Sequence, residues 1–550
     1  MEIESVGRRR AGVIEPSWAP GRIIEEPIIP EFSGGGLTIS IPAPIHVENH
    51  FPATPDRRVP VWARNVALVL FGLQLLAMVV FSTVEYHRYA LTQDFANYSQ
   101  AWWAIAHGHL DPYSAGFGVP FWRNNAEFAM WPLSLLYHVY PQPVVLLWVQ
   151  DVAVVATEVV AFGWIVRVLD SRSDRVPRSV ATALGVGAAV VLVADPWAFE
   201  TIAFDFHFET LATLFVVLAG RDLWAGRTRR LWWWAPLALL STALAGIYLV
   251  GVGLSGVVAG RRTRRPALVI TVVGAAWVVA LSALGGIGVG GTALRSSYGY
   301  LVGPHPGRVG LLDVALGAFG HPGSVAHMVA AHWLVVFGFL AVVGVVGVLS
   351  PWGLGVALVV LVPNILDGSG VFIRFAASFQ SWAALPFVLV GTVMVLLHLL
   401  ERGPVARRAA AAAAAVWAPV LAVFAFVVFS TVAPDWLSVS PAAASELARV
   451  QTTVPADAEI VVSQGVVGRF GERRSVYAFA RPHQSLPVNR RRVIFVLTSE
   501  GVADALPQHG VQTVLQFVRT RLDARPLASS SGVHVLEWDP APGTTHETLP

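Results

Sequence analysis

The chain has 550 residues, of which 55% are hydrophobic and only 13% are charged, and its net charge is +3. A soluble globular protein usually has about 25% charged residues, so this composition argues against a soluble enzyme and indicates an integral membrane protein. The chain contains no Cys, which excludes disulfides and thiolate metal sites. Its Arg residues lie in short loops beside apolar runs, so membrane topology explains the positive charge better than a nucleic-acid partner does.

Residues 1–58 are interrupted by Pro and Gly and contain no long apolar core. This pattern predicts a disordered cytoplasmic tail rather than a secretory signal. A first membrane span is predicted at 62–84, because a span needs about 20 apolar residues. Arg57, Arg58 and Arg64 flank the start of this span. Since Arg stays preferentially on the cytoplasmic side, the N-terminus is predicted to be cytoplasmic.

Beyond the first span, apolar runs alternate between Arg-rich connectors and connectors with almost no Arg. The Arg-rich connectors are Arg167 to Arg178, Arg221 to Arg230, Arg261 to Arg265 and Arg402 to Arg408. The same charge rule makes these connectors cytoplasmic and places large outer loops at 85–142 and 287–326. The further spans are predicted at 143–167, 179–195, 207–221, 266–286, 327–349, 351–366, 376–398 and 409–432.

The segment 231–260 is too long for one comfortable span, yet it has Arg on both flanks. Both of its ends are therefore expected on the same side of the membrane, which predicts a hairpin of two short helices that turn near Ala243 to Gly246. Each arm would fall short of the ~20 residues that a crossing needs. Short arms of this kind are tolerated where they line a cavity inside the protein. If the segment is a single span, every later loop is inverted.

The predicted fold class is an α-helical polytopic protein of the cell membrane. About 11 transmembrane helices are expected within residues 59–434, followed by a small extracytoplasmic α/β domain in residues 435–550. Strands in that domain are predicted at 459–463, 475–480, 492–498, 512–518 and 533–538, which are rich in Val, Ile, Phe and Tyr. Ser440 and Pro441 predict the start of a helix that ends near 453, and Ser499 predicts the cap of another that ends near 508.

Two outer segments contain most of the polar side chains suited to chemistry. Asp94 follows the first span, while Asp205, His207 and Glu209 lie where an outer loop re-enters the membrane. Asp205 and Glu209 share one face if this stretch is helical, because they are four residues apart. Carboxylates at the edge of hydrocarbon are costly unless they face water, a partner or a metal. These residues are therefore candidates for a general base or for ligands of a divalent cation.

Structural roles compete with these functional interpretations. Asp94 is equally well placed to cap the helix that follows it, and His207 to be a hydrogen-bonded histidine at the membrane interface. Four more histidines lack the tight spacing of metal ligands, so no metal site is assigned to them. These are His305, His321, His327 and His332.

Three stretches of the chain resemble an uncharacterised family of bacterial polytopic membrane proteins, the domain of unknown function 2079. They are QDFANYSQAWWAIAHGHLDPY from Gln93, FDFHFETLA from Phe204 and VPADAEIVVSQGVVGRFGERRSVYAFA from Val454. The resemblance runs from about residue 62 to about residue 500 and is dense only in these stretches. Such proteins are similar in layout to C-type (GT-C-like) glycosyltransferases, which have an acidic residue in the first outer loop and a polyprenyl-phosphate-linked sugar as donor.

The resemblance implies an outer-face glycosyltransferase that moves a sugar from a polyprenyl-phosphate donor to a cell-envelope acceptor. By that resemblance, Asp94 is the candidate general base, and Asp205, His207 and Glu209 line the same substrate-binding cavity. Glu127 stands where the family has a histidine before a Phe, and it is included among the substrate-binding candidates.

Such a transferase must stabilise a phosphate leaving group with a cation or a metal. Arg123 and Arg374 are the main candidates for that contact, and a divalent cation is left open as a cofactor. At Ala243 to Gly246 the chain has no charge where the family usually has a Lys-Glu-Asp-like cluster. A divergent or inactive member is therefore also compatible with the sequence. So are a transporter or flippase of lipid-linked envelope material and a non-catalytic envelope scaffold.

Overall fold

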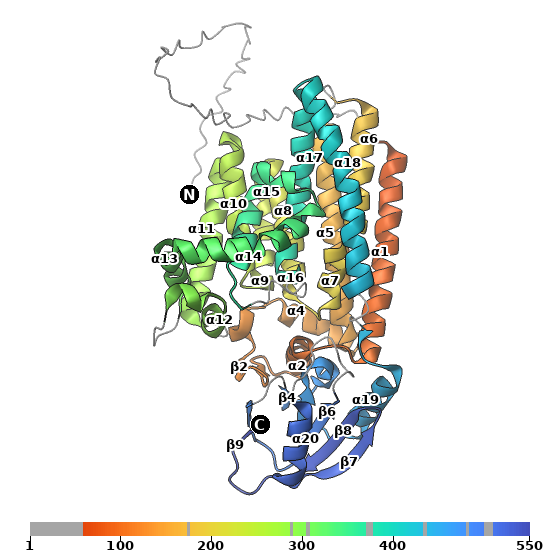
Figure 1. Ribbon diagram of the computed structural model, residues 1–550, viewed down its shortest axis with the longest axis vertical. Coiled ribbons are helices and arrows are strands. Elements are labelled where there is room, and N and C mark those ends of the chain that lie inside the picture. Colours follow the sequence, from red (N-terminus) through yellow and green to blue (C-terminus); the bar gives the residue numbers. More distant parts are fainter. Residues whose placement is uncertain are drawn as a thin grey trace, which may run out of the picture. The chain divides into compact units, whose positions relative to one another are not determined.

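The computed structural model describes residues 59–172, 176–285, 290–303, 309–369, 378–432, 437–479, 483–499 and 510–550 (Figure 1). The predicted tail at 1–58 and most of the helix predicted after Ser499 lie outside these ranges. Within them, seven helical stretches are long and apolar enough to cross a membrane. The structure therefore confirms a polytopic helical protein with a small C-terminal sheet, and its long helices are fewer than the eleven expected.

The seven long stretches are Val61–Arg88, Val144–Asp170, Arg178–Ala203, Arg261–Leu284, Pro322–Ala341, Gln380–Glu401 and Pro404–Ser430. They contain α1 (Val61–Arg88), α5 (Val144–Asp170), α6 (Arg178–Val193), α7 (Pro196–Ala203), α11 (Arg261–Leu284), α14 (Pro322–Ala341), α17 (Leu385–Glu401), α18 (Pro404–Val427) and parts of α16 (Ser378–Trp382) and η4 (Val428–Val432). The stretch from Arg178 is interrupted at Asp195, whose side chain accepts a hydrogen bond from the backbone N–H of Trp197 and caps α7.

Four further helices of the bundle are shorter than the roughly 20 residues that a bilayer crossing usually takes. They are α8 (Phe208–Trp224), α9 (Thr228–Ser241), α10 (Ala245–Ala259) and α15 (Pro351–Ile365), with 17, 14, 15 and 15 residues. The predicted hairpin is confirmed, because α9 and α10 are separate helices and the chain reverses between them. Thr242 contacts Glu209 at the start of α8, whereas Gly256 of α10 lies against Leu223 at the end of α8. Next to the hairpin, α10 and α11 approach so closely that a Cβ on Gly274 would lie 2.5 Å from the Gly246 carbonyl oxygen.

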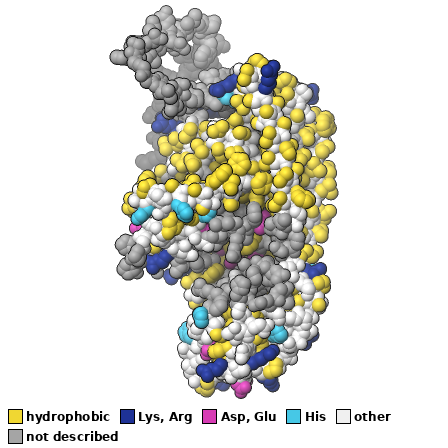
Figure 2. Space-filling model, viewed as in Figure 1, with side chains coloured by type: hydrophobic (Ala, Val, Ile, Leu, Met, Phe, Trp, Pro, Cys, Tyr) yellow, Lys and Arg dark blue, Asp and Glu magenta, His cyan; other side chains and the backbone are white. Residues whose placement is uncertain are grey.

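One end of the bundle, which we call the arginine side, collects the basic connectors. Arg64 pairs with Asp170 at 2.9 Å and Arg172 with Glu401 at 3.0 Å, so the end of α5 meets the start of α1 and the end of α17. Arg167 also lies within electrostatic range of three Arg residues that follow or end α8. Hydrophobic side chains cover most of the bundle in Figure 2, with basic side chains at its upper end. The connectors predicted to share one membrane face are therefore together in space.

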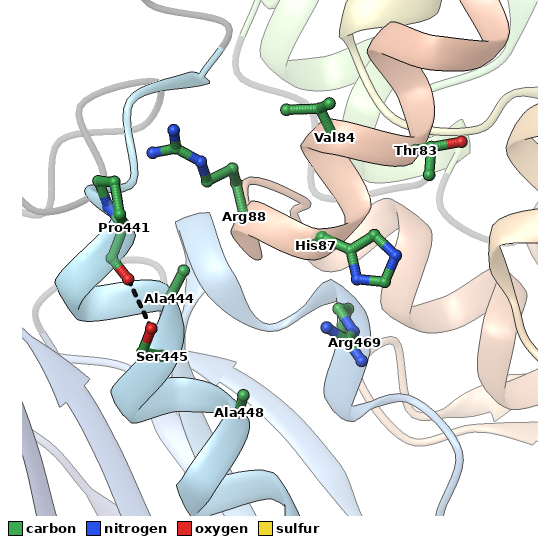
Figure 3. Close-up of a pocket in the computed structure, with 9 residues that line it drawn as sticks. All are labelled: Thr83, Val84, His87, Arg88, Pro441, Ala444, Ser445, Ala448 and Arg469. Carbon is green, nitrogen blue, oxygen red and sulfur yellow. Dashed lines mark hydrogen bonds between the residues drawn. The ribbon is translucent and has the colours of Figure 1, made fainter.

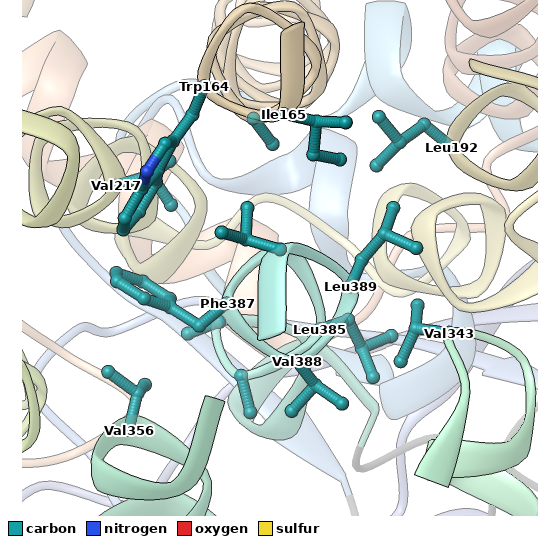
Figure 4. Packing of buried hydrophobic residues seen from close by; sticks show 14 of the residues in the cluster. Trp164, Ile165, Leu192, Val217, Val343, Val356, Leu385, Phe387, Val388 and Leu389 are labelled. Atoms are coloured by element: carbon teal, nitrogen blue, oxygen red, sulfur yellow. The ribbon is translucent and has the colours of Figure 1, made fainter. Parts of the chain in front are cut away.

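The interior of the bundle is a continuous apolar core in which α17 occupies a central position. Phe387 and Val388 of α17 are fully buried and lie among side chains of the neighbouring helices in Figure 4. The ring of Phe387 meets the indole of Trp164 edge-on, with 5.8 Å between centroids. Helices that are apolar on every face belong inside a bundle rather than at its lipid-facing surface.

The C-terminal region contains a mixed five-stranded sheet with the order β4-β3-β6-β8-β7. Strands β4 and β6 pair with β3 in parallel, whereas β8 pairs with β6 and β7 in antiparallel fashion. The strands are β3 (Glu459–Ser463), β4 (Val476–Phe479), β5 (Ser485–Pro487), β6 (Val493–Thr498), β7 (Arg525–Ser530), β8 (Val533–Trp538) and β9 (His546–Thr548). The short β5 and β9 pair separately.

Helix α19 (Pro441–Thr453) begins as predicted, because the Ser440 hydroxyl accepts a hydrogen bond from the Ala443 N–H at 3.2 Å. The strand predicted at 512–518 is wrong, since Val511–Thr520 forms helix α20. Its buried residues Val511, Val514, Leu515 and Val518 follow the helical period of three and four residues. That period outweighs the β-branched composition on which the strand prediction relied.

The segment predicted as the first outer loop is structured and contacts the C-terminal region. It contains α2 (Gln93–Ala106), β1 (Tyr113–Ser114), β2 (Val119–Pro120), α3 (Trp122–Asn125), α4 (Met130–Ser134) and η1 (Leu135–His138). Gly468 donates its N–H to the Leu91 carbonyl at 2.9 Å, and the Gln100 amide donates to the Arg473 carbonyl at 2.8 Å. A Cβ on Gly468 would lie 2.4 Å from that of Leu91, so this contact requires glycine. The second predicted loop contains α12 (Gly290–Val302) and α13 (Leu311–Gly320).

Candidate functional site

Asp205 is the residue that joins the two candidate segments. Its carboxylate accepts hydrogen bonds from the Thr92 N–H at 2.9 Å, from the Phe95 N–H at 3.3 Å and from the Thr92 hydroxyl. The first N–H groups of a helix have no partner within the helix, and Asp205 therefore caps α2 from a position more than 100 residues along the chain. The charge also suits the positive end of the helix dipole.

The backbone around Asp205 is held by Gln150 of α5. The Gln150 side chain donates to the Asp205 carbonyl at 2.7 Å and accepts the His207 N–H at 2.6 Å. Asp205 itself has a φ of 57°, a left-handed conformation in which Asp and Asn are tolerated better than most residues. One buried amide thus fixes both sides of a strained residue, and that residue in turn fixes the start of α2.

Asp94 lies in the first turn of α2 and is the only partly exposed carboxylate among the candidate site residues described in the structure. It is not the helix cap, because the Thr92 hydroxyl accepts the Asp94 N–H at 3.4 Å and occupies that role. The capping interpretation of Asp94 is therefore wrong. Burial, with the charges of Asp205 and Glu209 nearby, raises the pKa of Asp94 to about 7. The side chain is left available for chemistry near neutral pH.

Tyr98 occupies the centre of the cluster, one helical turn after Asp94. Its hydroxyl donates to Glu127 at 2.8 Å, and its ring meets those of Phe206, His207 and Phe208 edge-on. Glu127 is fully buried. The structure thus brings Glu127 to the same cluster as Asp94 and Glu209, both of which lie within electrostatic range of Tyr98.

His207 and Glu209 are both about 4% exposed and lie on the inner side of the cluster. The Nδ1 atom of His207 is 3.9 Å from a carboxylate oxygen of Glu209, and the Thr242 hydroxyl donates to the other oxygen at 3.5 Å. Burial lowers the pKa of His207 to about 3, so the imidazole is neutral and does not cancel the charge of its neighbours. Thr242 belongs to the turn of the α9–α10 hairpin, which therefore reaches this cluster.

We call Asp94, Tyr98, Glu127, Asp205, His207 and Glu209 the acidic site. Arg123 is exposed and lies over the ring of Trp122 at 5.3 Å, and no described contact links it to the acidic site. Arg374 lies outside the described residues, so its assignment as a phosphate ligand stays a prediction. Among the residues that the structure describes, no three His, Asp or Glu side chains are grouped closely enough to hold a metal ion.

Sequence reasoning missed three residues that organise this region. Tyr98 is four residues after Asp94, and the helical period alone could have placed both on one face. Gln150 and Glu85 were hidden inside apolar runs, where an isolated polar residue is itself a signal of function or of a buried partner. Glu85 is fully buried in the last turns of α1, within electrostatic range of Asp205 and Asp151.

Further carboxylates continue from the acidic site into the bundle. We call Glu85, Asp151, Glu158 and Asp195 the carboxylate row, and each of them is at most 2% exposed. Ser82 donates to Asp151 at 3.0 Å, and Asp195 lies within electrostatic range of Glu158. Asp151 and Glu158 are both on α5, where seven residues correspond to roughly 10 Å of helix. The carboxylate row therefore extends along α5 away from the acidic site and into the bundle.

Comparison with known proteins assigns a family to this arrangement. A family model described as a predicted membrane protein, DUF2079, matches residues 89–533. The match includes α2, the segment from Phe204 and most of the C-terminal sheet. No curated protein matches the chain.

Proposed function

The chain belongs to the DUF2079 family of predicted membrane proteins. From the acidic site, and from the resemblance in layout to C-type glycosyltransferases, we propose that it is a membrane-embedded transferase in which Asp94 is the general base. In this proposal the sugar comes from a polyprenyl-phosphate donor and passes to a cell-envelope hydroxyl on the outer face. Asp94 removes the proton from the acceptor hydroxyl as its oxygen attacks the anomeric carbon and the bond to the donor phosphate breaks. The lipid phosphate then leaves as an anion.

The observation that carries this proposal is one partly exposed carboxylate backed by buried ones. A general base works best when its pKa lies near the working pH, and burial raises the pKa of Asp94 to about 7. Asp205, Glu209 and Glu127 are almost completely buried, so in this proposal they do not contact the acceptor. The charges of Asp205 and Glu209 help to raise the pKa of Asp94. Tyr98 donates a hydrogen bond to Glu127 and also lies near Asp94 and Glu209.

The experiment is a transfer assay with the full-length protein in lipid nanodiscs. Polyprenyl phosphates carrying radiolabelled hexoses or pentoses are mixed with delipidated envelope material, and transfer of label to that material is measured. Asp94→Asn is assayed beside Asp111→Asn, because Asp111 is an exposed carboxylate of the same segment. Label transfer by the wild type and Asp111→Asn, but not by Asp94→Asn, is expected. No transfer by the wild type from any sugar of the panel would overturn the proposal.

The pH dependence of transfer follows from the same residue. Asp94 must be deprotonated to act as a base, so the rate is expected to fall about tenfold for each pH unit below about 7 and to level off above it. Glu209→Gln removes one of the negative charges that raise this pKa, and it is expected to move the midpoint to lower pH. If the midpoint of the pH profile is unchanged in Glu209→Gln, the group that titrates is not Asp94.

A second candidate function is a proton-coupled carrier of lipid-linked material, and the carboxylate row favours it. Ionisable groups within a membrane domain are commonly parts of proton or ion pathways. Proteoliposomes with an entrapped pH-sensitive dye and an imposed membrane potential would report proton entry. A carrier is expected to give entry above that of protein-free liposomes, and Glu158→Gln is expected to abolish it while Asp111→Asn does not. Proton entry that is the same in all samples would leave the transferase as the proposed function.

A further inference from the structure

A second site is formed where the end of α1 meets α19, away from the residues of the acidic site. A cavity of about 390 Å³ opens between these helices and a turn of the C-terminal region. The residues that line it are Thr83, Val84, His87, Arg88, Pro441, Ala444, Ser445, Ala448 and Arg469 (Figure 3). None of these nine residues is acidic.

Arg469 is held rigidly at the cavity. Its guanidinium carbon lies 4.3 Å from the ring centre of Tyr86 and 4.2 Å from that of Tyr89. Cation–π contacts of this kind fix the position of the group while its positive charge is kept. A cation that is already in place loses little entropy when an anion binds, which favours recognition.

Arg88 supplies the second fixed cation, and His87 lies beside it in the last turn of α1. One guanidinium nitrogen of Arg88 donates to the Val439 carbonyl at 3.1 Å, so this side chain is also anchored. Two acidic groups lie near these cations. Glu446 of α19 pairs with Arg449, and burial raises the pKa of Glu472, which lies near Arg469, to about 7, so Glu472 has only part of its negative charge at neutral pH.

The cavity is continuous with the apolar outer face of α1. Exposed side chains recur there every three or four residues and therefore lie on one face of the helix: Val69, Leu73, Leu76, Val80 and Val84, which are 38–62% exposed. Val84 belongs both to this row and to the cavity lining. A ligand with an anionic head at the Arg residues can thus extend an apolar chain along α1, in the position of membrane lipid.

We propose that this cavity binds the phosphate headgroup of an anionic phospholipid, with an acyl chain on the exposed face of α1. Both Arg88 and Arg469 line the cavity, and each guanidinium group can donate charge-assisted hydrogen bonds to a phosphate. The end of a membrane-spanning helix is also the depth at which headgroups lie. The bound lipid contacts α1, α19 and the turn that carries Arg469. It therefore ties the C-terminal region to the bundle.

The test is lipid binding to the delipidated full-length protein in detergent, followed by native mass spectrometry. Phosphatidylglycerol, phosphatidylcholine, a polyprenyl phosphate and inorganic phosphate are titrated separately and in competition. Preferential retention of one phosphatidylglycerol is expected. Arg88→Gln is expected to weaken it about tenfold, the effect of losing one charge-assisted hydrogen bond. Ala448→Glu, which adds a carboxylate at an exposed lining position, is expected to weaken it at least as much.

Arg519→Gln is the matched control, because Arg519 is an exposed arginine of α20 outside the cavity lining. It is expected to bind phosphatidylglycerol as the wild type does. Equal retention of phosphatidylcholine, or no loss of binding in Arg88→Gln and Ala448→Glu, would overturn the proposal. Preferential retention of the polyprenyl phosphate, or of inorganic phosphate, would assign the cavity to that anion instead and overturn the phospholipid assignment. The test needs no turnover, so its result is independent of the proposed transferase activity.

Discussion

Asp94→Asn is expected to slow sugar transfer about 10³-fold while the protein remains folded. General base catalysis typically contributes 10²–10⁴-fold, and an amide cannot accept the acceptor's proton at neutral pH. The substitution removes no cap from α2, because Thr92 and Asp205 supply those hydrogen bonds. The loss should therefore appear in kcat, with the apparent KM for the lipid donor little changed. Initial rates at saturating donor would measure it.

Two companion variants make this expectation specific. Asp94→Glu keeps the carboxylate but moves it by one methylene, so partial activity is expected. Asp111→Asn removes an exposed carboxylate of the same segment and is expected to be fully active. Full activity in Asp94→Asn would show that Asp94 is not the general base. The residues of the carboxylate row would then be the next candidates.

Asp205→Ala is expected to lower the free energy of unfolding by about 4 kcal/mol, because it removes the cap of α2 and leaves buried N–H groups without partners. The Thr92 and Phe95 N–H groups both donate to this carboxylate. The backbone of residue 205 has a φ of 57°, a left-handed conformation that is unfavourable for alanine. This strain is expected to lower the free energy of unfolding by roughly 1 kcal/mol in addition to the loss of the hydrogen bonds. Unfolding monitored by tryptophan fluorescence in mixed micelles would report the change.

Asp205→Asn is the matched variant for this experiment. Asn keeps one acceptor oxygen and tolerates the left-handed backbone, so less than half of the alanine effect is expected. The effect of Asp205→Asn reports mainly the loss of the charge, and the difference between the two variants reports the loss of the remaining acceptor together with the backbone strain that alanine adds. Equal stability of the wild type and Asp205→Ala would show that α2 begins without help from Asp205.

Much of the helical architecture could be predicted from local sequence. The long apolar runs of α1 and α5 and the Arg-rich connectors are one-dimensional signals, and the structure confirms both the helices and the meeting of the connectors. The α9–α10 hairpin was also predictable, because Arg on both flanks indicates that both ends of the segment lie on the same side of the membrane. Helix α20 could have been recognised from the spacing of its buried Val and Leu residues, which the strand interpretation overlooked.

The candidate site could be predicted only in part. Asp94, Asp205, His207 and Glu209 were marked by their acidity beside apolar runs, and the structure brings them together. The capping of α2 by Asp205 could not be anticipated, because it depends on a contact between residues 113 positions apart. The same is true of Gln150, whose amide is ordinary in sequence and becomes informative only when both of its hydrogen bonds are known.

The length of α9 and α10 has a consequence for the biogenesis of the protein. At 1.5 Å per residue, helices of 14 and 15 residues reach only about 22 Å, against a hydrocarbon core of about 30 Å. We therefore expect that neither helix inserts stably on its own during synthesis. The hairpin is expected to settle in the membrane once α11 has been made, because the close backbone approach of Gly246 and Gly274 supplies its packing surface. In that case the order of translation sets when the Thr242 side of the acidic site is completed.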